Sequence, residues 1–337
     1  MESKAKFIPN PKKRLMDQVR EVMRFHHYAY RTEQSYCLWI VRFIKFFQSQ
    51  RHPREMGVPE VQRFLSHLAS EKNVAAATQK QALNALVFLY RDVLDQPLGP
   101  GIDAKRSKKK VQPPTVMTES EVTLLLDAME GTHRLMAQLM YGGGLRLMEC
   151  IRLRVKDIDF GQEQLFVRHG KGDKDRVTLL PKRLHRPLQA QLDRVRELHD
   201  KDLAEVFGEV HMPEALDRKY PSAAKSIQWQ YVFPARKRST DPRSGKERRH
   251  HVMENGLQKA VKRAAERTGL TKRVTSHTLR HSFATHMLEH GTHIRALQEL
   301  MGHADVKTTE IYTHVMRRDL KRLTSPLDRI MEDHASH

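Results

Sequence analysis

Cysteine is nearly absent from this chain of 337 residues, which holds only Cys37 and Cys150. Two cysteines are too few for a disulfide framework or a four-cysteine zinc site, so a reducing compartment is expected. Long apolar runs are missing as well, because the stretch LWIVRFIKFF is interrupted by Arg42 and Lys45. The N-terminal residues MESKAKFIPNPKKRLMD also lack the apolar core of a signal peptide. We therefore expect a soluble, cytoplasmic protein with no membrane partner.

Acidic residues are outnumbered in this sequence. There are 40 Asp and Glu against 60 Lys and Arg, which gives a formal net charge of +20 at pH 7. An excess of this size favours a polyanionic partner, above all nucleic acid. A generally basic surface would have the same composition, so charge alone leaves the question open. The hydrophobic share of 39% is sufficient for packed cores, and the length predicts two domains.

Residues 14–95 have the periodicity of four amphipathic helices separated by turn segments such as SQRHPREMGVP. Strand-like alternation is lacking there, so a compact helical domain is expected. Residues 96–114 that follow carry prolines, glycines and the basic run KRSKKK, a composition typical of an extended linker. The run could be a solvated segment, but between two basic domains we expect it to lie along phosphates.

Residues 115–337 are predicted to form a second domain. Thr118 and Glu121 have capping-box spacing, and a helix is expected to end at Tyr141, before three glycines and a further helix over LRLMECIRLRV. The segments VKDIDF, EQLFVRHG and RVTLLP alternate apolar and polar residues, which predicts a small antiparallel sheet. Residues 205–250 are polar and irregular. Further helices are predicted over residues 182–204, 253–268, 278–289, 293–301 and 305–315.

Residues that suit one reaction lie in separate motifs of the second domain. They are Arg146 after YGGG, Lys171 in RHGKGDKDR, His277 with Arg280 in HTLRHSFATHMLEHG, and His303 with Tyr312 in MGHADVKTTEIYTH. Simpler interpretations exist, since a turn lysine is usually solvated and such a tyrosine is usually packed in a core. A zinc site using His277 and His281 is another alternative, but the glutamate of an HExxH motif is missing.

Together these groups have the chemistry for transesterification at a phosphodiester. Two arginines can clamp its non-bridging oxygens and stabilise a pentacovalent transition state. A lysine can protonate the leaving 5′ oxygen, histidines can assist proton movement, and a tyrosine can hold the strand as a 3′-phosphotyrosine. Because this bond conserves energy, rejoining needs neither metal nor ATP, and no cofactor is expected.

The motifs GGGLRLMEC, GKGDKDR, HTLRHSFATHMLEHG and LMGHADVKTTEIYTH resemble those of the tyrosine recombinase (phage integrase) family in order and spacing over residues 118–316. The N-terminal segment resembles the family's SAM-like core-binding domain. The resemblance implies a mainly α fold with a small antiparallel sheet, a C-shaped clamp on DNA, and a homotetramer on two DNA sites that is monomeric when free. It implies Tyr312 as nucleophile, Arg146 and Arg280 as phosphate clamps, Lys171 as general acid, and His277 and His303 as acid–base or hydrogen-bonding partners.

Residues 205–250 are longer than the corresponding part of ordinary family members. The segments MPEALDRKYP, WQYVFP and STDPRSGKERRHH resemble the extra helix and flanking loop of integron integrases. This resemblance implies that Trp229, Pro242, His250 and His251 hold bases flipped out of a folded single strand, by stacking worth about 1–3 kcal/mol each. Core packing of Trp229 and a solvated RRHH turn are the simpler interpretations. Arg168 stands where an aromatic residue can stand in relatives, which argues against a second stacking platform there.

The sequence thus predicts a bacterial, DNA-associated recombinase that integrates and excises gene cassettes at attI and folded single-stranded attC sites of integrons. A chromosome-dimer-resolving or phage-type tyrosine recombinase is the alternative within this class. A non-catalytic DNA-binding regulator with the same fold is the alternative from another class. His314 receives no role, and the amphipathic residues after Tyr312 are candidates for docking into a neighbouring protomer.

Overall fold

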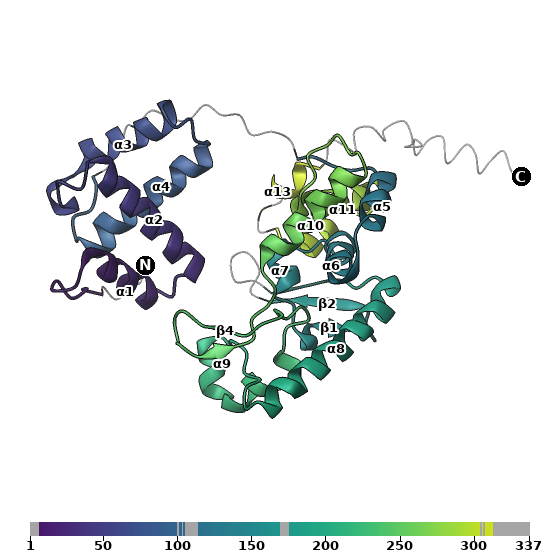
Figure 1. Ribbon diagram of the computed structural model, residues 1–337. Coiled ribbons are helices and arrows are strands. Elements are labelled where there is room, and N and C mark those ends of the chain that lie inside the picture. The colour runs from purple at the N-terminus through teal and green to yellow at the C-terminus, as the bar shows by residue number, and fades with distance from the viewer. Residues whose placement is uncertain are drawn as a thin grey trace, which may run out of the picture. The chain divides into compact units, whose positions relative to one another are not determined.

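The structure of the protein is a computed structural model (Figure 1). It describes residues 7–99, 101–102, 104, 114–168, 175–303, 305 and 307–312. The chain divides into two compact units, Met1–Gln112 and Pro113–His337. Each unit is described by itself below. The basic run KRSKKK of the predicted linker lies outside the described residues.

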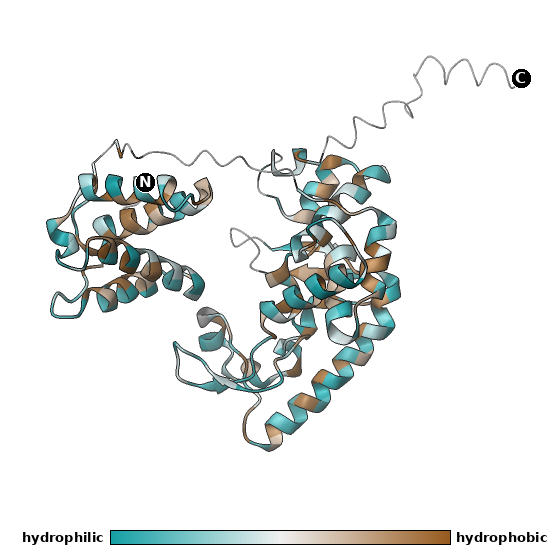
Figure 2. Cartoon of the chain, turned by 45° about the horizontal axis from the view of Figure 1, so that its top comes forward, coloured by the Kyte–Doolittle hydropathy of each residue, from teal (hydrophilic) through white to brown (hydrophobic). Residues whose placement is uncertain are grey.

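The first unit is helical, as predicted. Its helices are α1 (Leu15–Phe25), α2 (Tyr30–Phe46), α3 (Val58–Ser70) and α4 (Ala76–Phe88), with a 3-10 turn at Pro53–Glu55 and a π-helical turn at Leu89–Val93. Apolar and hydrophilic stretches alternate along these helices (Figure 2), as expected of amphipathic elements. The apolar faces meet in one core that includes Val22, Ile40, Phe43, Leu65 and Leu86, each at most 1% exposed.

The second unit contains helices around a small sheet, which confirms the predicted fold class. The strands β1 (Ile158–Asp159), β2 (Gln164–Val167) and β3 (Arg176–Leu179) pair antiparallel in the order β1-β2-β3, with Phe166 opposite Val177. The predicted capping box is confirmed, since the Thr118 hydroxyl accepts from the Glu121 amide and Oε2 of Glu121 accepts from the Thr118 amide at 2.7 Å. The helices are α5 (Glu119–Asp127), α6 (Gly131–Gly142), α7 (Leu147–Ile151), α8 (His185–Ala204), α10 (Glu254–Arg267), α11 (Ser276–Glu289), α12 (Ile294–Met301) and α13 (Lys307–Glu310).

Residues 205–250 contain short regular elements, of which the resemblance implied a helix and the sequence did not reveal the hairpin. They are α9 (Glu214–Lys219), 3-10 turns at Pro221–Lys225 and Ile227–Trp229, and a hairpin of β4 (Ser239–Thr240) and β5 (Glu247–Arg248). A buried carboxylate near the end of α8 holds the hairpin. Asp202 accepts two hydrogen bonds from Arg249, at 2.5 and 2.7 Å, and one from Arg238 at 3.0 Å. The segment is therefore fixed to the rest of the second unit by charge as well as by packing.

Two predicted helices are shorter than expected. The helix over LRLMECIRLRV ends at Ile151, because the backbone beyond it pairs instead with residues 205–250 (the inserted segment). The Val155 amide donates to the Gln230 carbonyl at 3.0 Å, and the Leu153 carbonyl accepts from the Val232 amide at 2.8 Å. The helix predicted over 305–315 is α13, which ends at Glu310, and residues 313–315 lie outside the described residues. Tyr312 follows α13 in a turn closed by its amide and the Thr309 carbonyl at 3.0 Å.

In the described part of the chain, every helix is too short or too polar to cross a membrane.

Candidate active site

Four of the predicted site residues lie close together in the second unit, although they come from separate elements. Arg146 caps the N-terminus of α7, and Arg280 lies in the second turn of α11. His303 follows α12 directly, and Tyr312 follows α13. His277 lies at the exposed start of α11, where the nearby protein atoms and the charges of Arg280 and Arg146 lower its pKa. The predicted position Lys171 lies outside the described residues.

A buried carboxylate, Glu149, organises the arginines. Its Oε1 accepts from Nη1 of Arg146 at 2.7 Å, and its two oxygens accept from Nη1 and Nη2 of Arg176 at 2.9 and 2.7 Å. Nη1 of Arg280 lies 3.7 Å from Oε2. Burial opposes ionisation, but the hydrogen bonds and charge of Arg176, and then Arg146, lower the pKa of Glu149 to about 2. Glu149 is thus an anion that holds three cations in one place.

Arg280 is buried among backbone carbonyls. It is 4% exposed, and it donates to the carbonyl of Gly144 and, at 2.5 Å, to that of Met301. Burial, followed by the charge of Arg146, lowers the pKa of Arg280 to about 9, against the opposing effect of Glu149. Glycine is required at position 144, because its φ is +61° and a Cβ there would lie 2.5 Å from the Phe283 ring.

His303 links Arg280 to the segment that carries Tyr312. Nη2 of Arg280 lies 3.2 Å from Nε2 of His303, and Nδ1 of His303 lies 2.8 Å from Oγ1 of Thr309. Since arginine can only donate, Nε2 is the acceptor, and the proton on Nδ1 is donated to Thr309. The Thr309 side chain is buried, and its carbonyl accepts from the Tyr312 amide. Thr309 therefore connects the Arg280–His303 pair, through its hydroxyl, with the backbone of Tyr312, through its carbonyl.

Tyr312 combines the packed position of a core residue with a place beside the arginines. It is 1% exposed and belongs to an apolar cluster with Phe283, Leu288, Leu297 and Met301. Its hydroxyl lies 2.6 Å from Nδ1 of His281. Burial raises the pKa of Tyr312, although the charges of Arg280 and Arg146 act in the opposite direction. The simpler interpretation of a buried tyrosine therefore holds together with its place at the site.

The zinc alternative finds no support in the described ranges, which contain no group of three His, Cys, Asp or Glu side chains able to hold a metal ion. His281 instead uses Nδ1 in its contact with Tyr312. Burial, and then the charges of His277 and Arg280, lower the pKa of His281 to about 4, so its ring is neutral near pH 7.

Sequence reasoning did not single out Glu149, Arg176 or Thr309, and it weighed His281 only as a zinc ligand. The spacing of three residues between Arg146 and Glu149 could have revealed the first. The contacts of Arg176 with Glu149 and of His281 with Tyr312 join segments far apart in the chain, so the sequence contains no local signal for them.

Two family models match the chain. The model described as "Phage integrase family" matches residues 115–318, and that described as "Phage integrase, N-terminal SAM-like domain" matches residues 15–100. The chain belongs to the phage integrase family. It is 48% identical over 317 residues to an integrase/recombinase of Escherichia coli, covering 94% of this chain and 93% of that one. It is 32% identical to the tyrosine recombinase XerA of Thermococcus kodakarensis, covering 86% of this chain and 87% of the relative.

Solved structures of integrases and recombinases have the same fold. The Tn1549 transposon integrase in complex with transposon right end DNA matches with a TM-score of 0.58 at 16% identity, covering 93% of this chain and 100% of that one. The XerH recombinase bound to a palindromic difH substrate matches with a TM-score of 0.54 at 20% identity, covering 91% and 83%. Identities this low support the fold alone.

Three of the four residues predicted to stack on bases, Trp229, Pro242 and His250, lie within residues 205–250, and His251 directly follows them. Trp229 is half-buried, with Nζ of Lys156 2.9 Å from its ring centroid and the Arg154 guanidinium at 5.2 Å, both cation–π distances. Burial, and then the charge of Arg168, lower the pKa of Lys156 to about 8. The residues YVF that follow shortly after Trp229 pair with the chain through a bridge between Arg154 and Tyr231. The Lys156 ammonium and the Arg154 guanidinium therefore lie over the ring of Trp229.

The remaining three lie in and after the hairpin of β4 and β5. Pro242 is exposed in its turn. The His250 ring is half-buried and nearly parallel to that of Tyr231, with centroids 6.3 Å apart and planes at 20°. The His251 ring lies edge-on to His250 at 5.8 Å. Burial lowers the pKa of both histidines, that of His251 to about 4, so flat neutral rings are available near pH 7.

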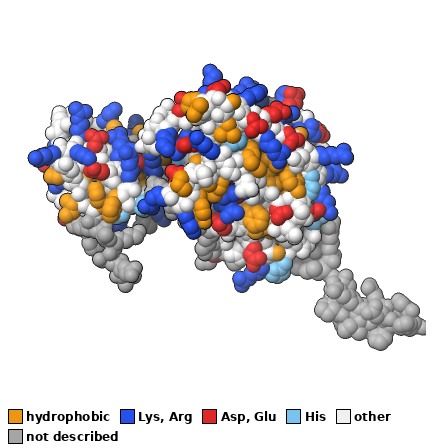
Figure 3. All heavy atoms as spheres, turned by 90° about the horizontal axis from the view of Figure 1, so that it is seen from below, with side chains coloured by type: hydrophobic (Ala, Val, Ile, Leu, Met, Phe, Trp, Pro, Cys, Tyr) orange, Lys and Arg blue, Asp and Glu red, His pale blue; other side chains and the backbone are white. Residues whose placement is uncertain are grey.

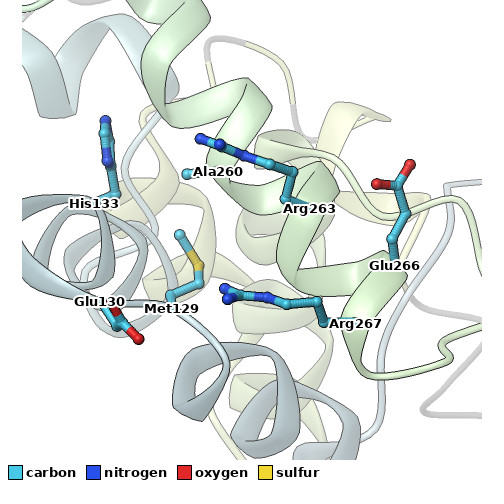
Figure 4. A pocket seen from close by; sticks show the side chains of 7 residues that line it. All are labelled: Met129, Glu130, His133, Ala260, Arg263, Glu266 and Arg267. Carbon is cyan, nitrogen blue, oxygen red and sulfur yellow. The ribbon is translucent and has the colours of Figure 1, made fainter.

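A cavity of about 540 Å³ lies elsewhere in the second unit, between the start of α6 and α10 (Figure 4). Its lining includes Glu130 and His133 on one side and Arg263 and Arg267 on the other. Burial, followed by the charges of Arg263 and Arg236, lowers the pKa of His133. The Arg267 guanidinium donates to the Ala128 carbonyl. None of the predicted catalytic residues lines this cavity.

Proposed function

We propose that this chain is a site-specific DNA recombinase that cuts and rejoins strands through a 3′-phosphotyrosine at Tyr312. One observation carries the proposal most directly. The Tyr312 segment is joined by hydrogen bonds through Thr309 and His303 to Arg280, which shares Glu149 with Arg146. A nucleophile and a cationic phosphate site therefore form one connected unit. Lys and Arg side chains are also widespread on the face seen in Figure 3, which favours a polyanionic partner.

The proposed reaction assigns a role to each group. The scissile phosphate binds to Arg146, whose side chain is 23% exposed, and to Arg280. The Tyr312 oxygen forms a bond to phosphorus while the bond from phosphorus to the 5′ oxygen breaks, and Lys171 supplies the proton that the 5′ oxygen takes. His277 holds the phosphate by a hydrogen bond, and His303 accepts from Arg280 as its hydrogen-bonding partner. Attack by a free 5′ hydroxyl reverses these steps and rejoins the strand without metal or ATP.

Because Tyr312 is buried, its attack requires movement of the segment after α12. The segment is short, and α13 spans only Lys307–Glu310. A displacement small enough to keep the phenol within reach of Nδ1 of His281 would bring it in line with the phosphorus atom. The Thr309 hydroxyl bonds to His303, so such a displacement would also act on the partner of Arg280.

The proposed substrates are the attI and folded attC sites of integrons, recombined by a homotetramer on two DNA sites that forms from free monomers. The inserted segment supports this choice, because it contains Trp229, over whose ring two cations lie, and because His250 and the adjoining His251 have lowered pKa values. Cations next to an aromatic face suit a nucleotide whose base stacks there while its phosphate is neutralised. Chromosome-dimer resolution is the second candidate, favoured by the similarity to proteins named XerA.

The nucleophile is tested with a nicked suicide substrate, which traps the covalent intermediate, followed by mapping of the modified residue. Wild-type protein should give an adduct at Tyr312, and Tyr312→Phe should bind DNA normally without forming one. Arg146→Ala and Arg280→Ala should each slow cleavage by about 10²-fold or more. Recombination by Tyr312→Phe would show that the nucleophile is another residue. A protein that binds DNA but never forms an adduct would instead be the non-catalytic regulator.

The substrate class is tested by comparing a folded single-stranded site with a double-stranded site. The double variant His250→Ala, His251→Ala should lose recombination on the folded site and retain it on the double-stranded one. Arg134→Ala, which changes an exposed ion pair with Asp127 on another surface, is the matched control and should leave both reactions unchanged. Equal losses on both substrates would count against the integron assignment.

A further inference from the structure

The hydroxyl of Tyr312 has a defined hydrogen-bonding partner on α11. Nδ1 of His281 lies 2.6 Å from it, and the two ring centroids are 5.7 Å apart with planes at 48°. His281 directly follows Arg280 in α11. One turn of this helix therefore carries the proposed phosphate ligand, Arg280, and contacts the proposed nucleophile, Tyr312. His277, at the exposed start of the same helix, faces solvent instead.

The direction of this hydrogen bond follows from the protonation of both groups. Burial raises the pKa of Tyr312, so the phenol keeps its proton near pH 7. Burial together with His277 and Arg280 lowers the pKa of His281 to about 4, so the imidazole is neutral there. The charged group that acts on Tyr312 from α7 is Arg146. The phenol therefore donates, Nδ1 of His281 accepts, and the remaining imidazole proton is on Nε2.

We propose that His281 is a further catalytic residue of this reaction, namely the group that takes the phenol proton when Tyr312 attacks phosphorus. The proposal rests on the function proposed above. The proton passes from the Tyr312 oxygen to Nδ1 of His281, the new oxygen–phosphorus bond forms, and the bond to the 5′ oxygen breaks. The 5′ oxygen receives a proton from the general acid, Lys171. On rejoining, His281 returns its proton to the departing tyrosine oxygen.

The surroundings of His281 couple its basicity to DNA binding. The charges that act on it, that of Arg280 and that of His277 when protonated, are positive. In the protein alone a positive imidazolium at His281 is therefore disfavoured. A phosphodiester bound to Arg280 and Arg146 offsets these charges and makes the imidazole a stronger base. The proton is accepted most readily when the substrate is in place. Tyr312 thus becomes a better nucleophile only beside a phosphate.

The test is single-turnover cleavage of the nicked suicide substrate as a function of pH, with His281→Asn and His281→Ala. Near neutral pH, both variants should cleave about 10²-fold more slowly than wild type. Their deficit should shrink as pH rises, by about tenfold per unit, because hydroxide then ionises the phenol without help. His290→Ala on the same helix is the matched control, since that residue is exposed and bonds to the carbonyl of His286. It should cleave like wild type.

A second measurement separates proton transfer from structural support. Replacing Tyr312 by a fluorinated tyrosine, whose phenol ionises more easily, should accelerate His281→Asn much more than it accelerates wild type. DNA affinity and the melting temperature of the Asn or Ala variant serve to show that the fold is kept. A deficit that stays constant with pH, or equal acceleration in both backgrounds, would overturn the role of His281.

The two proposals fail in different ways. If wild-type protein forms an adduct at Tyr312 and both His281 variants cleave at the wild-type rate, only the role of His281 is wrong. If wild-type protein forms no adduct, or forms one at another residue, the proposed function and the role of His281 both fall.

Discussion

Arg176 meets Glu149 through two parallel hydrogen bonds, from Nη1 to Oε1 at 2.9 Å and from Nη2 to Oε2 at 2.7 Å. Nε of Arg176 also donates to the Leu300 carbonyl at 2.8 Å. A single side chain from β3 thereby connects the start of α7 with the end of α12. Because the carboxylate is held on one side by Arg176, it can hold Arg146 and Arg280 on the other. The geometry of the proposed phosphate site thus depends on two residues that need not touch the phosphate.

Glu149→Gln should damage both stability and cleavage. The change leaves three guanidinium groups close together without their shared anion, and breaking such a buried pair costs about 3 kcal/mol of unfolding free energy. Single-turnover cleavage should fall by about tenfold or more, because Arg146 loses its fixed position. Chemical denaturation and cleavage of the suicide substrate measure the two effects. Wild-type stability in this variant would show that Glu149 does not organise the arginines.

The Glu149–Arg176 pair also predicts that the stability of the protein depends on pH. The pKa of Glu149 is lowered from an ordinary value of 4.5 to about 2, so the folded protein favours the ionised carboxylate. Its contribution is fully present above the unfolded pKa and is lost as pH falls through the folded pKa. The stability difference between wild type and Glu149→Gln should therefore shrink from about pH 4.5 to about pH 2. A difference that stays constant over this range would contradict the assignment.

Gly144→Ala should disturb the site through two effects at one position. At φ +61° an alanine is strained, and its Cβ would lie 2.5 Å from the ring of Phe283. Together these effects should cost about 3 kcal/mol, and the displaced Phe283 should shift Tyr312, which packs in the same cluster. Gly291→Ala is the matched control, because Gly291 has φ +84° but open space around its Cβ position. It should show the backbone strain alone, about 1 kcal/mol, with normal cleavage.

Thr309→Val should test the link between His303 and the tyrosine segment. Valine keeps the shape of threonine but removes the hydroxyl that accepts from Nδ1 of His303. An unpaired buried donor costs about 1–3 kcal/mol, so cleavage should fall by about tenfold while DNA affinity is kept. Thr308→Val, at an exposed position in the same helix, is the control. Equal rates for the two variants would show that the hydroxyl of Thr309 has no role in the reaction.

Asp202→Asn should loosen the inserted segment without touching the arginine cluster. Asp202 accepts from Arg249 and Arg238, and although burial opposes its ionisation, these two arginines lower its pKa. Losing the carboxylate charge should raise hydrogen exchange in the hairpin of β4 and β5 by about tenfold. Recombination of a folded single-stranded site should fall more than that of a double-stranded site. Unchanged exchange in the hairpin would show that other contacts hold it.

Much of the fold could be predicted because amphipathic helices must repeat their apolar residues every three or four positions. This periodicity predicted four helices in residues 14–95 and located α8, α10, α11 and α12 to within a few residues. It failed where tertiary pairing decides the backbone. The helix α7 ends early because Leu153 and Val155 pair with the inserted segment, and a strand of two residues such as β4 is too short to show alternation.

The site residues divide in the same way, into those that local motifs predicted and those that depend on contacts between distant segments. Arg146, Arg280, His303 and Tyr312 stand in motifs with recognisable spacing, and the structure brings them together. Arg176 lies inside a quoted motif, but its role depends on a carboxylate 27 positions away. The contact between His281 and Tyr312 spans 31 positions, and its 2.6 Å length is set by how α11 packs against the turn after α13. Periodicity and spacing contain no information on such contacts.

The arginine cluster has a consequence for how the protein balances folding against reactivity. Three guanidinium charges face one carboxylate in a buried place, and the pKa of Arg280 is lowered to about 9 by its burial and then by the remaining repulsion from Arg146. An apolar side chain in place of Arg280 would relieve this repulsion, and it would also remove a donor from the phosphate site. Such local frustration is typical of functional sites, where greater stability comes with lost activity. In this chain, burial disfavours the charge of Arg280, and a bound phosphate would stabilise that same charge.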